Sequence, residues 1–203
     1  MTSHPPAQCC TVGVTHEGEA KGEYTTLENN GTSMKGFSNL PSNATLTSVR
    51  PKLTIYQNIT VECYLAYPAD RSTKRGVLIL TDVIGHRYIN AQLIADQMAA
   101  NGFFVAMPDL FHGDPIQLNR PPGFDVMAWL KGPPGHLPDR VDPVVKNAIE
   151  FMRKKGCEKI GGVGYCFGVS YQTITGPLAL GIGVLRISLT KENPTRQNTL
   201  SGL

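Results

Sequence analysis

One cysteine occupies the position that a catalytic nucleophile would take. Cys166 lies at the centre of Gly164-Tyr-Cys-Phe-Gly168, which is the glycine–x–nucleophile–x–glycine pattern. In such a segment a strand ends, the backbone reverses sharply and a helix begins, so the central residue is strained. The flanking glycines remove side chains that would clash there. We predict that the bend projects the Cys166 thiol from the top of a sheet, and that the start of the following helix lowers the pKa of the thiol.

The same residues allow two other interpretations. One is a glycine-rich turn around a buried cysteine, because unpaired cysteines are among the most buried residue types. The other is a dinucleotide-binding loop that begins at Gly162. That pattern calls for a glycine where Phe167 stands, and Gly168 comes one residue late. The spacing therefore favours a nucleophile.

Hydrophobic patterning predicts the elements that position this cysteine. Four segments have the patterning of strands: 60–67, 76–81, 103–107 and 159–163. The first alternates polar and apolar residues, which indicates one polar face, and the others are apolar runs typical of strands buried on both faces. Three segments have helical spacing of apolar residues: 89–100, 124–130 and 139–155. This alternation predicts a doubly wound, mostly parallel α/β sheet.

Three reactive side chains lie at or just past the carboxyl ends of the predicted strands. They are Asp82, Asp109 and Cys166. Ligands of open α/β sheets bind beyond that edge. The sequence therefore predicts a functional site there.

Composition divides the chain into three parts. Residues 1–58 are rich in Gly, Ser, Thr, Asn and Pro, and we expect an extension that is mostly loop or disordered. Residues 59–168 form the predicted core. Residues 169–203 form a tail in which Pro177 and β-branched residues do not continue a helix.

The charge and cysteine patterns exclude several classes of function. The chain has 203 residues and a net charge of +3 without a dense Lys/Arg stripe, so nucleic-acid binding is unsupported. No apolar run approaches the ~20 residues of a membrane span, and no secretory signal is visible, so we expect a cytoplasmic protein without a membrane partner. Five cysteines, with Cys9 and Cys10 adjacent, form neither a disulfide framework nor a cluster at zinc spacing.

Three motifs together resemble those of a known family. They are Leu80-Thr-Asp-Val-Ile-Gly85, Met107-Pro-Asp-Leu-Phe-His-Gly-Asp114 and Gly162-Val-Gly-Tyr-Cys-Phe-Gly168. In this order they resemble the dienelactone hydrolase family of α/β-hydrolases, particularly its fungal members. The resemblance spans 59–168. It implies an enzyme that cleaves lactone or carboxylic-ester bonds of small molecules with a Cys-His-Asp triad, without a metal or organic cofactor.

The resemblance also assigns roles to residues. It implies that Cys166 is the nucleophile, and that the backbone N–H of Phe167 with one near Val83 or Ile84 forms the oxyanion hole. Asp82 falls where bacterial members carry a glutamate that interacts with the resting thiol. The shorter aspartate makes that role a weaker expectation.

The acid and base of the triad have no counterpart in this sequence. In this fold they follow the nucleophile, but all five histidines precede Cys166 and no aspartate follows it. We therefore expect a C-terminally incomplete hydrolase with impaired activity. His86 and His112 follow predicted strands and are candidate surrogate bases, although each also fits a histidine at the rim of the site that is satisfied by water or backbone. His136 is expected to be a loop residue.

Several alternatives stay open at this point. Residues 31–57 and 169–203 interrupt or end the resemblance, and we hypothesise that they come from retained introns or a wrong gene model. Without later strands, the edge of the strand before Cys166 would be exposed, which predicts poor solubility. A non-catalytic α/β binding module, a pseudoenzyme and a thiol-dependent redox protein are the competing functions. The oligomeric state is not readable from the sequence.

Overall fold

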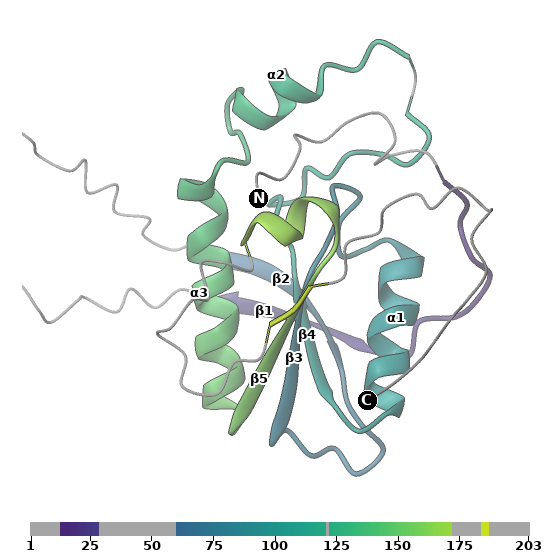
Figure 1. Ribbon diagram of the computed structural model, residues 1–203, viewed down its shortest axis with the longest axis vertical. Coiled ribbons are helices and arrows are strands. Elements are labelled where there is room, and N and C mark those ends of the chain that lie inside the picture. Colours follow the sequence, from purple (N-terminus) through teal and green to yellow (C-terminus); the bar gives the residue numbers. More distant parts are fainter. Residues whose placement is uncertain (1–12, 29–59, 121, 172–183, 187–203) are drawn as a thin grey trace, which may run out of the picture.

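The computed structural model describes residues 13–28, 60–120, 122–171 and 184–186, which form a mixed sheet with helices on both faces (Figure 1). Cys9, Cys10, the segment 31–57 and most of the tail lie outside the described residues. No helix in the described ranges is both long and apolar enough to cross a membrane.

Six strands and four helices make up the described fold. The strands are β1 (Glu23–Glu28), β2 (Thr60–Ala66), β3 (Arg75–Leu80), β4 (Phe104–Pro108), β5 (Lys159–Gly164) and β6 (Val184–Arg186). The helices are α1 (Ile89–Ala100), α2 (Val126–Lys131), α3 (Pro138–Lys154) and the 3₁₀ helix η2 (Cys166–Tyr171).

The sheet has the strand order β1-β2-β4-β3-β5-β6. The pairs β4–β3, β3–β5 and β5–β6 are parallel, whereas β1–β2 and β2–β4 are antiparallel. Strand β3, helix α1 and strand β4 form a β-α-β unit. The carboxyl ends of β3, β4 and β5 consequently meet at one edge of the sheet.

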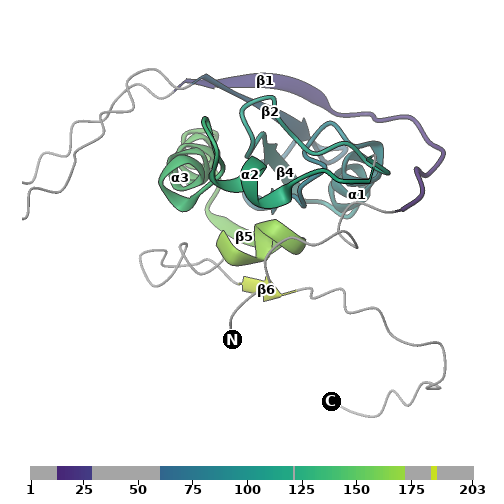
Figure 2. The same ribbon diagram turned by 90° about the horizontal axis from the view of Figure 1, so that it is seen from above.

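Helices α1 and α3 cover opposite faces of the sheet (Figures 1 and 2). Successive residues of β4 alternate between the two cores: Phe104 and Ala106 pack on the α3 side, and Val105 and Met107 pack on the α1 side. All four are fully buried. Burial on both faces is the reason that this strand is a continuous apolar run.

The predicted helices agree well with the observed ones. Helix α1 spans the predicted residues and stops at Gly102, whose φ of +87° favours glycine. Helix α2 begins two residues later than predicted, because the Asp125 side chain caps it by accepting from two backbone N–H groups. Helix α3 begins one residue earlier than predicted. Leu137 is the N-cap, and Pro138 occupies the first turn, where a missing N–H costs nothing.

Strand β1 lies within the N-terminal extension, where the sequence predicted no strand. Residues Glu23–Glu28 pair antiparallel with β2 along their whole length, from Glu23 opposite Leu65 to Glu28 opposite Thr60. Of the six residues only Leu27 is buried, so local hydrophobicity carries almost no signal. The strand exists because its backbone groups pair with a neighbour remote in sequence.

The predicted polar face of β2 is present only at its start, where Thr60 is exposed and Glu62 is partly exposed. Residues Cys63–Ala66 are all buried, because β1 and β4 flank them and the two cores cover both of their faces. In the tail, β6 pairs in parallel with Gly162–Gly164, so the expected open edge of β5 is covered at these residues.

Candidate active site

The backbone bends sharply at Cys166, as the glycine spacing predicts. Strand β5 runs directly into the bend, the thiol residue is exposed, and φ of Cys166 is +48°. A non-glycine residue in this left-handed region is uncommon and costs of order 1 kcal/mol or more. The exposure disagrees with the interpretation of a cysteine buried in a glycine-rich turn.

Gly168 allows the bend to press against the end of β3. A Cβ at this position would lie 2.0 Å from the carbonyl oxygen of Leu80. Two hydrogen bonds join the same segments: the N–H of Tyr165 donates to Leu80 O at 3.0 Å, and the N–H of Gly168 donates to Thr81 O at 3.1 Å. The bend is therefore locked beside the loop that follows β3.

That loop, residues 82–88, is fixed by two hydrogen bonds to Asp82 within it and by one hydrogen bond from Ile116. The N–H of Ile84 donates to Asp82 Oδ1 at 2.9 Å, and the N–H of Gly85 donates to Asp82 O at 3.2 Å. The N–H of Ile116 donates to Val83 O at 2.8 Å. Because the Ile84 N–H already has an acceptor, this geometry argues against Ile84 as an oxyanion donor.

Asp82 is enclosed at the end of β3. Burial raises the pKa of its carboxyl, and hydrogen bonds from the backbone N–H groups of Ile84 and Gly85 offset only part of that effect. The first role of this aspartate in the structure is to close the turn of the loop. The role against the thiol that the resemblance implies remains a prediction.

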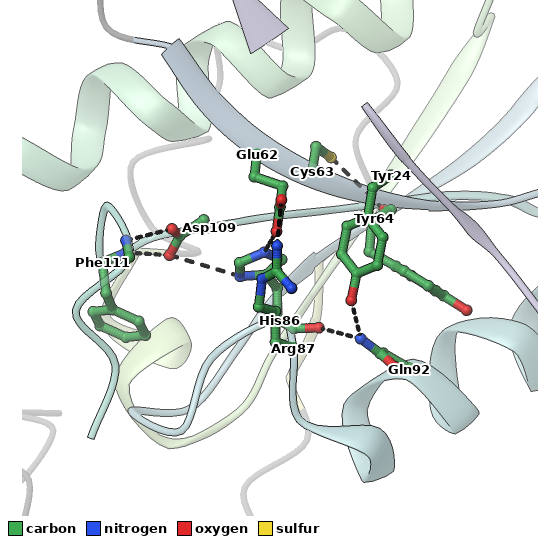
Figure 3. A network of polar contacts seen from close by, with 10 residues as sticks. Tyr24, Glu62, Cys63, Tyr64, His86, Arg87, Gln92, Asp109 and Phe111 are labelled. Carbon is green, nitrogen blue, oxygen red and sulfur yellow. Dashed lines mark hydrogen bonds and ion pairs between the residues drawn. The ribbon is translucent and has the colours of Figure 1, made fainter. Parts of the chain in front are cut away.

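His86 is held between two carboxylates (Figure 3). Its Nε2 lies 2.7 Å from Glu62 Oε1, and its Nδ1 lies 3.6 Å from Asp109 Oδ1. The residue is only 4% exposed. Its backbone carbonyl accepts a hydrogen bond from Gln92 Nε2 at 3.2 Å. These partners oppose the prediction of His86 as a surrogate base, because a base must be able to take a proton at the reacting atoms.

Asp109 faces its own loop rather than the edge of the sheet. Its Oδ1 accepts from the N–H of Phe111 at 2.9 Å, and its Oδ2 accepts from the N–H of Gly113 at 2.6 Å. Its own N–H donates to Glu62 O at 2.8 Å, which ties the end of β4 to β2. The predicted convergence of Asp109 with the thiol therefore gives way to a role in shaping the loop after β4.

His112, the second candidate base, faces helix α3. It is half-buried with φ of +52°, and its Nε2 lies 3.5 Å from the carbonyl oxygen of Arg140. A contact of that length is at the limit of a hydrogen bond. The imidazole of His112 thus lies beside the first turn of α3.

An aromatic cluster behind the bend escaped the sequence analysis. We call Phe111, Trp129, His136 and Phe167 the aromatic bracket. Ring centroids are 5.0 Å apart for Phe111 and Phe167, 5.3 Å for Phe111 and Trp129, and 4.2 Å for Trp129 and His136. Such contacts contribute about 0.5–1.5 kcal/mol each beyond burial. The bracket holds the side chain of Phe167, whose backbone follows the thiol.

Asp114 fastens the bracket at its outer end. Its carbonyl oxygen accepts from Trp129 Nε1 at 2.9 Å, and its Oδ2 lies 3.2 Å from His136 Nε2. His136 precedes α3, as predicted for a loop residue, but it is fully buried. The single tryptophan of the chain was the one sequence signal for a packed cluster here.

Because His136 of the bracket is buried, we expect the free energy of unfolding to fall in mild acid. Burial lowers the pKa of His136, although Asp114 opposes the effect, so the unfolded chain binds more protons below the ordinary histidine pKa of about 6.5. The free energy of unfolding should be at its full value above that pH. It should fall as the pH drops from about 6.5 toward the folded pKa. Urea unfolding at a series of pH values measures this slope.

His136→Gln should flatten that pH dependence, whereas His16→Gln, at an exposed position, should keep it. An unchanged slope in His136→Gln would contradict the assignment.

Among residues 13–28, 60–120, 122–171 and 184–186, no group of three or more His, Cys, Asp or Glu side chains could hold a metal ion.

Comparison with known proteins places this chain in a family. Hydrolase pyvD of Aspergillus violaceofuscus is 41% identical over 172 residues, which cover 84% of this chain and 56% of that protein. Hydrolase tropI of Talaromyces stipitatus is 45% identical over 177 residues, covering 84% of this chain and 58% of that protein. The chain thus spans a little over half the length of these relatives.

Among solved structures, an α/β hydrolase from Novosphingobium aromaticivorans superposes with a TM-score of 0.41 at 16% identity, over 64% of this chain and 40% of that one. Residues 61–177 match the family model described as the dienelactone hydrolase family, and this match covers more than half of the chain. It begins at β2 and passes through the bend at Cys166. The chain belongs to the dienelactone hydrolase family.

Proposed function

We propose that this chain carries the nucleophile of a hydrolase that cleaves carboxylic-ester or lactone bonds of small molecules, and that Cys166 is that nucleophile. One observation carries the proposal: an exposed thiol with φ of +48° stands at the carboxyl end of β5 in a member of a hydrolase family. Strain of this kind clusters at functional sites. An exposed thiol at a strand end is accessible to the carbonyl carbon of a substrate.

The proposed first step is acylation of the thiolate. The sulfur attacks the carbonyl carbon, and the electron pair of the C=O bond moves to oxygen. That pair then re-forms the C=O bond as the C–O bond to the alcohol breaks, which leaves a thioester and releases an alkoxide or phenolate that can take a proton from water. The N–H groups of Phe167 and Val83 are the proposed donors to the oxyanion. Support for this pair comes from the packing of Phe167 in the aromatic bracket and from the hydrogen bonds that join Tyr165 and Gly168 to residues 80 and 81.

The second step needs a base to activate water, and here we propose that this chain is slow. No histidine follows Cys166 in the 203 residues. His86 and His112 are engaged with Glu62 and Arg140, respectively. A thiol can be acylated by an activated ester without general acid catalysis, but hydrolysis of the thioester gains from a positioned base. Acylation should therefore outpace deacylation.

A chromogenic aryl acetate tests this proposal, because its phenolate leaves without needing a proton. Mixing it with the purified chain should release about one equivalent of phenolate per chain in a burst, followed by slow turnover. Mass spectrometry of proteolytic fragments should then place the acetyl group on Cys166.

The other thiols of the described core serve as internal controls. Burial raises the pKa of Cys157 to about 11, and it raises that of Cys63 further, so neither should be acetylated in the folded protein. The proposal is wrong if phenolate release leaves no adduct on Cys166, or if no burst occurs. The latter result would favour a non-catalytic α/β binding module, which the occupied histidines already make the second candidate.

A further inference from the structure

A polar cluster, which we call the clamp, holds the far end of the loop beside the bend. It consists of His86, Glu62, Asp109 and Arg87. His86 connects three elements, since its ring lies between Glu62 of β2 and Asp109 at the end of β4 while its backbone belongs to the loop after β3 (Figure 3). Both His86 and Asp109 are at most 5% exposed. Glu62 is fixed in turn by Arg87, whose Nη2 lies 2.6 Å from its other carboxylate oxygen.

The clamp is ionised at its outer carboxylate. Burial opposes the charge of Glu62, but the hydrogen bonds from His86 and Arg87 outweigh it and lower the pKa of that carboxyl. Charge-assisted contacts are the stronger and shorter kind of hydrogen bond, and both contacts to Glu62 are shorter than 2.8 Å. The ring of His86 is therefore held in one position.

The loop is anchored at three places besides this clamp. At its start, residues 80 and 81 accept the N–H groups of Tyr165 and Gly168, and in its middle Val83 O accepts the N–H of Ile116. After Gly85, whose φ is +88°, the next fixed side chain is that of His86. At its far end, the backbone carbonyl of His86 accepts from Gln92 Nε2 at 3.2 Å, and Tyr88 caps α1. The clamp adds the contacts that join this segment to β2 and to the end of β4.

We propose that His86 is a positioning residue. Held between Glu62 and Asp109, it fixes residues 82–85 of the loop so that the backbone N–H of Val83 faces the carbonyl oxygen of a substrate attacked by Cys166. This inference rests on the proposed function. Misplacing a catalytic group by about 1 Å can cost about 100-fold in rate, even when the mutation lies away from the chemistry. A loop that carries an oxyanion donor is sensitive to such a shift.

Two reactions of the same thiol separate this role from a merely structural one. Acylation by an aryl ester needs the oxyanion donors, whereas alkylation by iodoacetamide displaces iodide at a saturated carbon and forms no oxyanion. His86→Ala should lower the rate of the acylation burst by about 10-fold to 100-fold. It should leave the alkylation rate of Cys166 within about twofold, since the thiol itself is untouched.

Matched variants sharpen the comparison. His86→Gln keeps a donor toward Glu62 and should recover part of the acylation rate, while the exposed His16→Ala should change neither reaction. Equal losses in both reactions, or an acylation rate in His86→Ala equal to that of the unmodified chain, would overturn the proposal.

Amide hydrogen exchange tests the same clamp without any ester. His86→Ala should speed exchange in fragments covering residues 82–88 and leave α3 as slow as before. Faster exchange throughout the chain, or no change in the loop, would overturn the positioning role. If the unmodified chain gives no acylation burst at all, the proposed function fails, and the exchange result alone then decides whether His86 holds the loop.

Discussion

Replacing Cys166 by glycine is expected to abolish acylation and yet give a protein more stable than the alanine variant. Both substitutions remove the sulfur, so the burst of phenolate should fall at least about 10³-fold in each. Their stabilities should differ because only alanine keeps a Cβ at φ of +48°. Glycine has no such side chain and adopts this conformation readily.

Magnitudes decide the sign of that difference. At an ordinary position, glycine is about 0.5–1 kcal/mol less stable than alanine, because it loses more backbone entropy on folding. In the left-handed region a Cβ costs about 1–2 kcal/mol. The strain outweighs the entropy, so Cys166→Gly should exceed Cys166→Ala by about 1 kcal/mol in the free energy of unfolding.

Urea titration of the two variants measures this difference. Ala128 on the exposed side of α2 supplies the control, because Ala128→Gly should lower stability by about 1 kcal/mol in the usual direction. If glycine is less stable than alanine at both positions, the bend at Cys166 is not strained in solution. The thiol would then lack the conformation on which the proposed function depends.

Gly168→Ala is expected to cost about 3 kcal/mol, at the upper end of the usual overpacking penalty. Its Cβ would stand 2.0 Å from the carbonyl oxygen and 2.5 Å from the carbonyl carbon of Leu80. These are backbone atoms of β3 and cannot rotate away as a side chain would. Relief requires the bend to move off the strand, which would break the hydrogen bond from Gly168 N–H to Thr81 O.

A loss of this size should lower the melting temperature by roughly 6–12 °C in a chain of this length. Gly162→Ala in β5, the strand that leads into the bend, is the matched control, because a Cβ there meets nothing within 4 Å. Its effect should stay within about 0.5 kcal/mol. Equal melting temperatures for the two variants would contradict the close approach of the bend to β3.

The local pattern of apolar residues was enough to predict most of the elements that form the core. The bounds of α1 followed from apolar spacing, and the four strands β2 to β5 were each predicted to within one residue at each end. Their signal is local because a strand buried on both faces must be apolar along its length. The glycines around Cys166 also predicted the bend. The backbone at residue 168 lies so close to Leu80 that no side chain fits there.

The candidate bases show where local reasoning stopped. His86 and His112 both follow strands, and chain position alone gave them the same prediction. The partner of His86 is Glu62, 24 residues earlier on a different strand, and the partner of His112 is the backbone of Arg140. Which atom a side chain meets across such distances depends on the packing of whole elements, and no local pattern encodes it.

The amino-acid sequence was enough to establish a strand that runs into a glycine-flanked bend with a cysteine at its apex, since short-range sterics and periodicity dictate both. The folded chain alone revealed strand β1, the aromatic bracket and the two carboxylates around His86. Each of these depends on contacts between segments far apart along the chain, whose free energy is gained only when the sheet has assembled.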